Sequence, residues 1–316
     1  GDDPAALGRL AETLPDYGVP PELTGIQAWI NAEATTLADL RGKVVVVDFW
    51  TYSCVNCIRT LPHLRRWHDT DGDDLVVIGA HTPGFAFEAD RDNVARAVRD
   101  LDVPWPVALD SRYSTWSAWG NRYRPAKYVL GRDGHVRYAH FGEGAYAESE
   151  RVIRALLAEG APAVTLPAPG IADVDGTPFH RPQTPEIYLG HLRAQHYATA
   201  IRRDERSRYT RPADPGPDRV GLGGEWTVRG ERAVAGRDAR LRLHFRGAGV
   251  HLVLGPDARG GGEVVVRLDG GPPRTVRVRE HRLHTLARLD DGDAHRLDVA
   301  LSPGVSGYAF TFGGLG

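Results

Sequence analysis

The feature that most constrains this chain is a run of apolar residues that leads directly into a pair of cysteines. Residues 44–49 are interrupted only by Asp48, and such a continuous, β-branched run is typical of a strand buried on both faces. Cys54 and Cys57 come next, and the sequence from residue 57 to 67 has the pattern of a helix. The pair is therefore predicted to lie where a buried strand of a mixed sheet meets a covering helix.

Strand and helix patterns alternate from residue 23 to about residue 157. The expected helices are 57–67, 91–101 and 148–157, and the expected strands are 44–49, 75–80, 106–109, 128–130 and 136–141. This order predicts an α/β domain over residues 22–163, with a mixed sheet flanked by helices. Residues 1–21 alternate proline, glycine and charged residues, and we expect them to form a poorly packed leader.

The pattern changes in the second half of the chain. Residues 164–190 are rich in proline and are predicted to be a linker, with a short helix expected at 188–201. From Trp226 onward the hydrophobic residues recur with a period of two. Leu241, Leu243 and Phe245 show this alternation. Repeated short strands of this kind predict an all-β, jelly-roll-like sandwich over residues 191–316.

Composition and charge narrow the range of functions. The 316 residues, 41% hydrophobic and 25% charged, are enough for two ordinary globular domains. A formal net charge of −2 gives no reason to expect nucleic acid as a partner. No apolar run approaches the roughly 20 residues that cross a bilayer. The chain begins Gly-Asp-Asp-Pro and contains no methionine, so we expect a part of a longer or processed protein.

Two cysteines in a C-x-x-C spacing serve either as a redox pair or as half of a zinc site. Zinc needs four ligands, and the chain has no other cysteine to supply them. His63 and His68 lie on the predicted helix, but at about 100° per residue His63 points away from Cys54. A structural disulfide across two residues would close too small a loop to stabilise much. The redox interpretation is favoured, with a Cys54–Cys57 disulfide and no separate cofactor or metal.

The predicted positions give each group a role. Cys54 lies at the N-terminus of the helix, where free N–H groups and the helix dipole stabilise a thiolate. Cys57 falls one turn later on the same face, within reach to form or resolve a disulfide. Asp48 lies inside the apolar run, and burial is expected to raise its pKa. It is a candidate proton acceptor for the second thiol, with a capped strand-end carboxylate as the structural alternative.

Together these residues carry a resemblance. Asp48-Phe-Trp50, the cysteine pair and Pro62, eight residues after the first cysteine, resemble the thioredoxin superfamily. Three longer strings are similar to its TlpA-like branch, closest to DipZ-type proteins. They are Trp50-Thr-Tyr-Ser-Cys-Val-Asn-Cys57, His81-Thr-Pro-Gly-Phe-Ala-Phe-Glu88 and Trp119-Gly-Asn-Arg-Tyr-Arg-Pro125-Ala. The resemblance is strong over residues 22–160 and weaker over 183–316.

The resemblance implies further site residues. Pro125 maps onto the cis-proline that faces the cysteines in the family. Arg124 stands before it where the family usually has a smaller or apolar residue, and is expected either to act on the Cys54 thiolate or to extend into water. The positions expected to face the substrate are Trp50, Tyr52, Ser53, Val55, Asn56 and Arg124.

The resemblance also implies a setting. In DipZ-type proteins the thioredoxin-like domain follows a membrane electron-transfer region, lies outside the cytoplasmic membrane and occurs with a β domain similar to carbohydrate-binding modules. The leading hypothesis is an extracytoplasmic thiol–disulfide oxidoreductase tethered by a membrane region absent from this chain. It would reduce protein disulfides with electrons from a membrane dithiol carrier of the DsbD or CcdA kind.

Two alternatives stay open. Thr51-x-x-Cys54 is similar to the peroxiredoxin nucleophile loop, although Val47 stands where that motif has proline, so a thiol-dependent peroxidase is one alternative. The other is an envelope protein whose β domain binds a cell-envelope glycan through stacked aromatic rings, with the redox domain secondary. Its candidate residues are Trp226, Tyr308, Phe310 and Phe312, whose alternation also fits a strand packed in a core.

Overall fold

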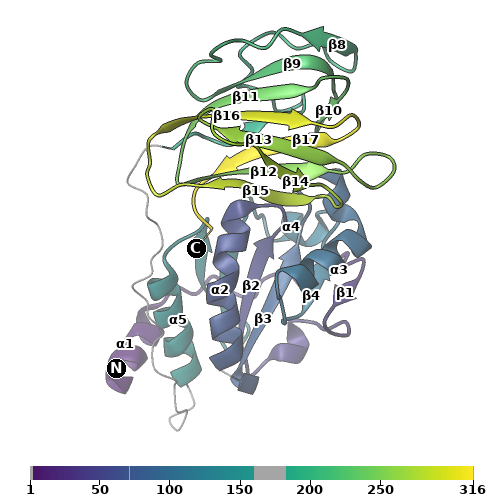
Figure 1. Ribbon diagram of the computed structural model, residues 1–316. Helices are drawn as coiled ribbons and strands as arrows, with labels where there is room; N and C mark the ends of the chain where they lie inside the picture. Colours follow the sequence, from purple (N-terminus) through teal and green to yellow (C-terminus); the bar gives the residue numbers. More distant parts are fainter. Residues whose placement is uncertain (1–2, 71, 160–182, 316) are drawn as a thin grey trace. The chain divides into compact units, whose positions relative to one another are not determined.

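The computed structural model describes residues 3–70, 72–159 and 183–315, and the chain divides into two compact units, residues 1–178 and 179–316 (Figure 1). The first unit is built on a six-stranded sheet in the order β1-β4-β3-β2-β5-β6. Its strands are β1 Trp29–Ile30, β2 Val44–Trp50, β3 Leu75–His81, β4 Val107–Leu109, β5 Ala126–Leu130 and β6 Val136–Phe141. Its helices are α1 Pro4–Thr13, α2 Val55–Thr70, α3 Arg91–Asp100, α4 Ser114–Ala118 and α5 Tyr146–Ala158, with 3-10 turns η1 Ala38–Leu40, η2 Gly72–Asp74 and η3 Ala86–Ala89.

Strand β2 occupies the middle of this sheet. It runs parallel to β3 and antiparallel to β5, and all of its residues are buried. Alternate side chains point to opposite faces of a strand. Val46 and Trp50 accordingly pack with residues of α2, whereas Val47 and Phe49 pack with Trp116 and Trp119 around α4. The sequence-based prediction of a strand buried on both faces is confirmed.

The expected α/β order of the first unit is confirmed, with small shifts at the element ends. Helix α2 begins before Cys57 and contains Pro62 in its interior. Strand β5 begins two residues earlier than expected, directly after Pro125. Within the described residues, no helix has the length and apolar character needed to cross a membrane.

The prediction of a poorly packed leader over residues 1–21 is wrong for residues 4–13, which form a helix. Helix α1 begins at Pro4, and the Asp3 carboxylate caps it by accepting the Ala5 N–H at 3.1 Å. Leu7 and Ala11 are buried against Ala155 of α5. Apolar residues one turn apart dock this short helix, a signal that the proline and glycine content obscured.

The second unit is formed by strands, and no helix occurs among its described residues. Its elements are β7 Ile187–Tyr188, β8 Arg206–Tyr209, β9 Arg219–Val228, β10 Ala233–Ala235, β11 Arg240–Arg246, β12 Gly249–Gly255, β13 Glu263–Leu268, β14 Arg274–Arg277, β15 Arg282–Arg288, β16 Ala294–Leu301 and β17 Ser306–Phe312. The path of pairing is β14-β13-β16-β11-β9-β10-β17-β12-β15, with β7 on β17 and β8 on β9. All named pairings are antiparallel, as an all-β sandwich requires.

One strand belongs to both layers of this sandwich. The first half of β9 pairs with β11, and its second half pairs with β10. Gly224 lies at the change of partner with a φ of +76°, and a Cβ there would stand 2.1 Å from the Asp238 carbonyl oxygen. Glycine is required at this bend, since other residues fit neither the dihedral nor the space.

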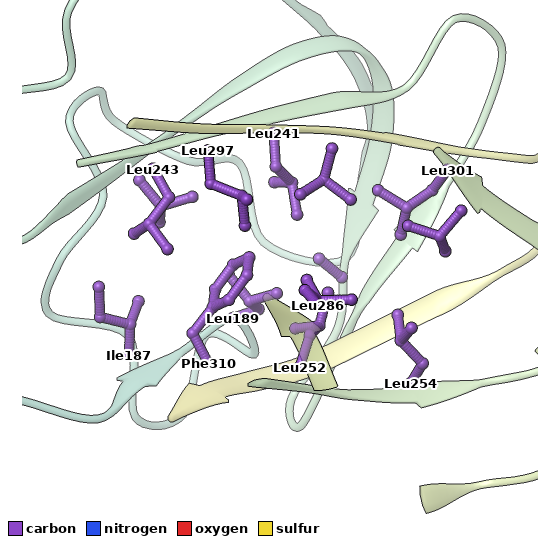
Figure 2. Close-up of a cluster of buried hydrophobic side chains, with 14 of the residues drawn as sticks. Ile187, Leu189, Leu241, Leu243, Leu252, Leu254, Leu286, Leu297, Leu301 and Phe310 are labelled. Carbon is purple, nitrogen blue, oxygen red and sulfur yellow. The ribbon is translucent and has the colours of Figure 1, made fainter. Parts of the chain in front are cut away.

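The core of the second unit lies between the two layers. Figure 2 shows Leu241, Leu243, Leu297 and Leu301 on one side of this core, opposite Leu252, Leu254 and Phe310 on the other. The predicted alternation is confirmed along β11, where Leu241, Leu243 and Phe245 are fully buried.

Three expectations about the second unit need correction. The predicted linker 164–190 lies mostly outside the described residues, but its last part belongs to the second unit, since β7 pairs with β17 and Ile187 and Leu189 are fully buried in the core. The helix expected at 188–201 is absent from these described residues. Of the proposed glycan-stacking rings, Trp226, Phe310 and Phe312 are core residues, and the Tyr308 hydroxyl accepts a hydrogen bond from Arg232.

The core position of Phe310 gives a stability prediction. Phe310→Ala should lower the free energy of unfolding of the second unit by about 3–5 kcal/mol, because it removes a fully buried ring. Hydrogen exchange of the β11 and β17 amides in the full chain measures this change. Leu192→Ala is the matched control, since that side chain is 72% exposed, and it should change stability by less than about 0.5 kcal/mol. Equal effects of the two substitutions would contradict the core assignment.

Candidate active site

The cysteine pair lies where β2 passes into α2. Cys54 immediately precedes the helix, and its carbonyl oxygen accepts the Ile58 N–H at 3.0 Å. The Cys57 backbone N–H donates to the Cys54 Sγ at 3.3 Å. Both cysteines are free thiols, Cys54 half-buried and Cys57 fully buried. The structure therefore places Cys54 at the helix N-terminus, as predicted. Of the two cysteines, Cys54 is the more exposed.

The surroundings of Cys57 oppose its ionisation. Burial raises the pKa of the Cys57 thiol well above its usual range, and the contact with Cys54 and the charge of Asp48 raise it further. Cys57 is thus protonated at neutral pH and needs a base before it can attack a disulfide.

Asp48 is the carboxyl group whose charge raises the pKa of Cys57. It is 1% exposed, and neither carboxylate oxygen has a hydrogen-bond partner among the described residues. Burial raises the pKa of Asp48 to about 7, against the opposing effect of the Lys127 charge. A carboxyl group with this pKa exchanges a proton readily at neutral pH, which a strand-end carboxylate in water does not.

Lys127 is a component that the sequence analysis missed. It is fully buried on β5, directly opposite Asp48 in the antiparallel pair, and its Nζ has no hydrogen-bond partner among the described residues. Burial lowers the pKa of Lys127. The signal was present in the sequence as a lysine inside an otherwise apolar strand, two residues after Pro125.

Glu88 is a second buried carboxylate near the cysteines, also without an assigned role in the sequence analysis. It accepts hydrogen bonds from the Thr51 hydroxyl, from the Ser53 N–H at 3.3 Å and from the Phe85 N–H at 3.1 Å. Burial raises the pKa of Glu88. These bonds tie the loop before Cys54 to the 3-10 turn η3, so Glu88 fixes the backbone that presents the first thiol.

His81 supports the same loop from β3. The ring is fully buried, and its Nε2 accepts the Tyr52 N–H at 3.2 Å. Burial lowers the pKa of His81 to about 3, so the imidazole is neutral at physiological pH. It stacks on Tyr52 and meets Trp50 edge-on. The ring is a packing and hydrogen-bonding support for the loop, without a charge of its own.

Of the residues expected to face the substrate, those between positions 50 and 55 are buried, and Asn56 is half-buried. Trp50 and Tyr52 were expected to face the substrate, but both rings are buried in the hydrophobic core. Ser53 and Val55 flank Cys54 and are also buried. Asn56 is half-buried, and its side-chain oxygen accepts a hydrogen bond from Arg59 at 2.5 Å.

The Arg124–Pro125 peptide bond is cis, as the resemblance implied. Phe49 pairs with Ala126, so the antiparallel register places Pro125 beside Trp50, at the end of β2 that leads to the cysteines. Arg124 does not extend into water. Its guanidinium donates to the carbonyl oxygens of Thr82 at 2.9 Å and Pro83 at 3.2 Å, and lies 4.9 Å from the centre of the Trp116 ring.

A zinc site was the alternative use of the cysteine pair. Within the described residues, no group of three or more His, Cys, Asp and Glu side chains is placed to hold a metal. His63 instead stacks on Tyr146, with ring centres 3.6 Å apart.

Comparison with known proteins shows which family the chain belongs to. The AhpC/TSA family matches residues 12–139, and the family described as "Thioredoxin like C-terminal domain" matches residues 184–313. The thiol-disulfide oxidoreductase YkuV of Bacillus subtilis is 30% identical over 139 residues, which cover 44% of this chain and 94% of YkuV. This chain belongs to the thioredoxin-like thiol–disulfide oxidoreductases.

Protein DipZ of Mycobacterium tuberculosis is similar to both units of this oxidoreductase, at 35% identity over 309 residues. The match covers 96% of the chain and 44% of DipZ, so the oxidoreductase spans less than half the length of this relative. The crystal structure of the thioredoxin-like superfamily protein SPOA0173 matches 46% of the chain and 99% of its own length, with 29% identity and a TM-score of 0.43.

The unequal burial of the two thiols predicts their reactivity in this oxidoreductase. In the reduced protein, iodoacetamide should modify Cys54 on the order of tenfold or more faster than Cys57, because Cys57 is buried and its pKa is raised. The single-cysteine variants Cys57→Ala and Cys54→Ala, followed by mass spectrometry, measure the two rates separately. Equal rates, or a faster Cys57, would contradict the described geometry.

Proposed function

We propose that this oxidoreductase reduces disulfide bonds of proteins outside the cytoplasmic membrane, with electrons from a membrane dithiol carrier. The observation that carries the proposal is the combination of a half-buried Cys54 at a helix N-terminus with a buried Cys57 and a buried Asp48 whose pKa is raised to about 7. These are the parts that a two-step thiol–disulfide exchange needs: a nucleophile, a resolving thiol and a base.

In the first step the Cys54 thiolate attacks one sulfur of the substrate disulfide. A mixed disulfide forms between Cys54 and the substrate, and the other substrate sulfur leaves as a thiolate that takes up a proton. In the second step Asp48 accepts the Cys57 proton, and the Cys57 sulfur attacks the Cys54 sulfur. The Cys54–Cys57 disulfide forms, the second substrate thiolate leaves, and two electrons have passed from the enzyme to the substrate.

The location and the electron donor rest on the relationship to DipZ. More than half of DipZ lies outside the matched region, and the resemblance to DipZ-type proteins implies a membrane electron-transfer region there. A dithiol of that region would restore the Cys54–Cys57 pair by the same exchange in reverse. The second unit is proposed to contribute no group to the exchange, since the sequence has no cysteine after Cys57.

The AhpC/TSA match makes a thiol-dependent peroxidase the second candidate. In this structure the Thr51 hydroxyl donates a hydrogen bond to Glu88, which holds it within the loop. A reduced enzyme that consumed hydrogen peroxide faster than it reduced insulin disulfides would favour the peroxidase over our proposal.

The roles of the two thiols predict a trapping experiment. With insulin as the disulfide substrate, Cys57→Ala should accumulate a mixed disulfide that dithiothreitol reverses, because no resolving thiol is left to release it. Cys54→Ala should accumulate none, since the remaining thiol is buried. Non-reducing gel electrophoresis distinguishes the species. The reverse pattern would exchange the two roles and overturn the assignment.

The proposed base predicts a pH dependence. In the wild type, resolution of the mixed disulfide should accelerate as pH rises through about 7, because Asp48 must lose its proton before it can accept one from Cys57. Asp48→Asn should remove this inflection and slow resolution at pH 7 by about 10²-fold. Stopped-flow kinetics with a fluorescent disulfide gives the rates.

The control for Asp48→Asn is the first step, measured in a Cys57→Ala background, where the attack by Cys54 should stay nearly unchanged. Loss of both steps to the same extent would show that Asp48 supports the structure of the site and does not serve as its base.

A further inference from the structure

One face of the second unit carries an excess of positive charge. The first half of β9 forms a layer with β11, β16, β13 and β14, and alternate residues of each strand point toward the core or away from it (Figure 1). On β11 the core side is Leu241, Leu243 and Phe245, so the residues that alternate with them lie on the outer face. The charged side chains of this outer face, all exposed or half-buried, are Arg219, Arg240, Arg242, Arg246, Arg267, Arg277, Arg296, Glu263 and Asp298.

These seven arginines and two carboxylates give the outer face a formal charge of +5, although the chain as a whole has a net charge of −2. The strand register sets the charges in rows across the layer. In one row Asp298 of β16 lies between Arg242 of β11 and Arg267 of β13. In the next row Arg296 lies beside His244. The excess of positive charge is therefore a property of this one surface.

The carboxylates near this face do not neutralise it. Asp298 accepts hydrogen bonds from Arg242 at 2.8 and 3.1 Å and from Arg211 at 2.7 Å. Arg296 forms an ion pair with Asp214 at 3.2 Å. Arg211 and Asp214 belong to the segment beside β9 and bring one charge of each sign, so the formal charge of +5 remains.

Four arginines of the outer face are available to a partner. Within the residues that the structure describes, these side chains form no ion pair: Arg219, Arg240, Arg246 and Arg277. At the end of the layer where β16 begins, the basic face stops at two acidic turns, which His295 joins by contacts of 2.7 Å to Asp269 and to Asp291. A negatively charged partner is therefore expected over the middle of the layer.

Two hollows on this face provide places for anionic groups. One has a volume of about 250 Å³ and is lined by Arg240 and Arg267. The other has a volume of about 420 Å³ and is lined by Arg242 and Arg296, and Asp298 borders both hollows. A guanidinium group binds phosphate through two parallel N–H bonds, so arginines that share a hollow favour a phosphate ligand.

The kind of partner follows from the charge and the side chains of this face. Its outward positions on the five strands hold no Trp, Tyr or Phe, so the face offers charge without aromatic stacking. Basic surfaces of this kind are attracted to anionic lipid headgroups. We propose that this face binds the anionic surface of a phospholipid membrane, with lipid phosphates at the two hollows. The choice of a membrane rests on the function proposed above, because the electron donor there is a membrane dithiol carrier.

Vesicle binding tests the proposal directly. The full chain should sediment with vesicles of equal parts phosphatidylglycerol and phosphatidylcholine, and should stay in solution with vesicles of phosphatidylcholine alone. Salt at about 1 M should release the chain, because charges are then screened beyond about 3 Å. Equal binding to the two kinds of vesicle, or binding to neither, would overturn the proposal.

The double variant Arg240→Gln, Arg267→Gln tests the location of the membrane contact. Both side chains are exposed and neither one holds Asp298, so the fold should be unaffected. Binding to the anionic vesicles should weaken by about tenfold or more. The matched control is Arg282→Gln, Arg288→Gln, which removes the same charge from exposed positions on β15 in the other layer and should weaken binding by less than about twofold. Similar weakening by the two double variants would show that net charge and not this face is responsible.

Two further measurements identify the partner and separate this proposal from the proposed function. Soluble polyglutamate that bound as tightly as the anionic vesicles, at equal charge concentration, would make the partner a soluble polyanion and overturn the membrane assignment. Insulin reduction by Arg240→Gln, Arg267→Gln should equal that of the wild type, because neither side chain belongs to the exchange. If the wild type binds anionic vesicles but does not reduce insulin, the basic face stands and the proposed function fails. If it reduces insulin but does not bind the vesicles, the proposal for the basic face fails.

Discussion

The structure of the active site depends on the burial of β2 on both faces. With β3 on one side and β5 on the other, this strand has no free edge, and its side chains enter two separate parts of the core. A fully paired, fully buried strand is a rigid support for the segment that leaves its end. In this chain that segment is the loop that ends at Cys54, which Glu88 and His81 hold from outside the strand. The position of the first thiol is therefore set by the core.

The same burial determines the chemistry of the second thiol. A buried polar group without a hydrogen-bond partner costs about 1–3 kcal/mol, and a buried charge costs more. Asp48 and Lys127 both lie in this environment, and their mutual attraction offsets part of the cost. Groups that weaken the fold in this way are typical of sites where reactivity depends on an altered pKa. Here the consequence is a carboxyl group with a pKa near 7 beside a thiol that resists ionisation.

Much of this arrangement could be predicted from the sequence because its signals are local. The apolar run of β2, the cysteine spacing and Pro62 lie within twenty residues of one another, and they indicated the fold, the redox pair and the burial of Asp48. Local patterns could not show which strand pairs beside Asp48. Lys127 is therefore absent from the prediction, although it lies directly opposite. Trp50 and Tyr52 were misplaced for a related reason, since only the fold shows that the loop turns their rings inward. The docking of α1 and the addition of β7 to the second unit likewise depend on distant partners.

The direction of electron flow depends on how far the fold stabilises the dithiol form of the cysteine pair relative to its disulfide form. In strongly oxidising members of this superfamily the dithiol form is stabilised, as in DsbA with a potential of about −120 mV. The function proposed above makes the reduced pair an electron donor, which requires that the fold does not stabilise the dithiol form in this way. The most direct test is the reduction potential of the Cys54–Cys57 pair, measured by equilibration with a series of glutathione redox buffers. Our account predicts a value near that of thioredoxin, about −270 mV, whereas a value near that of DsbA would contradict it.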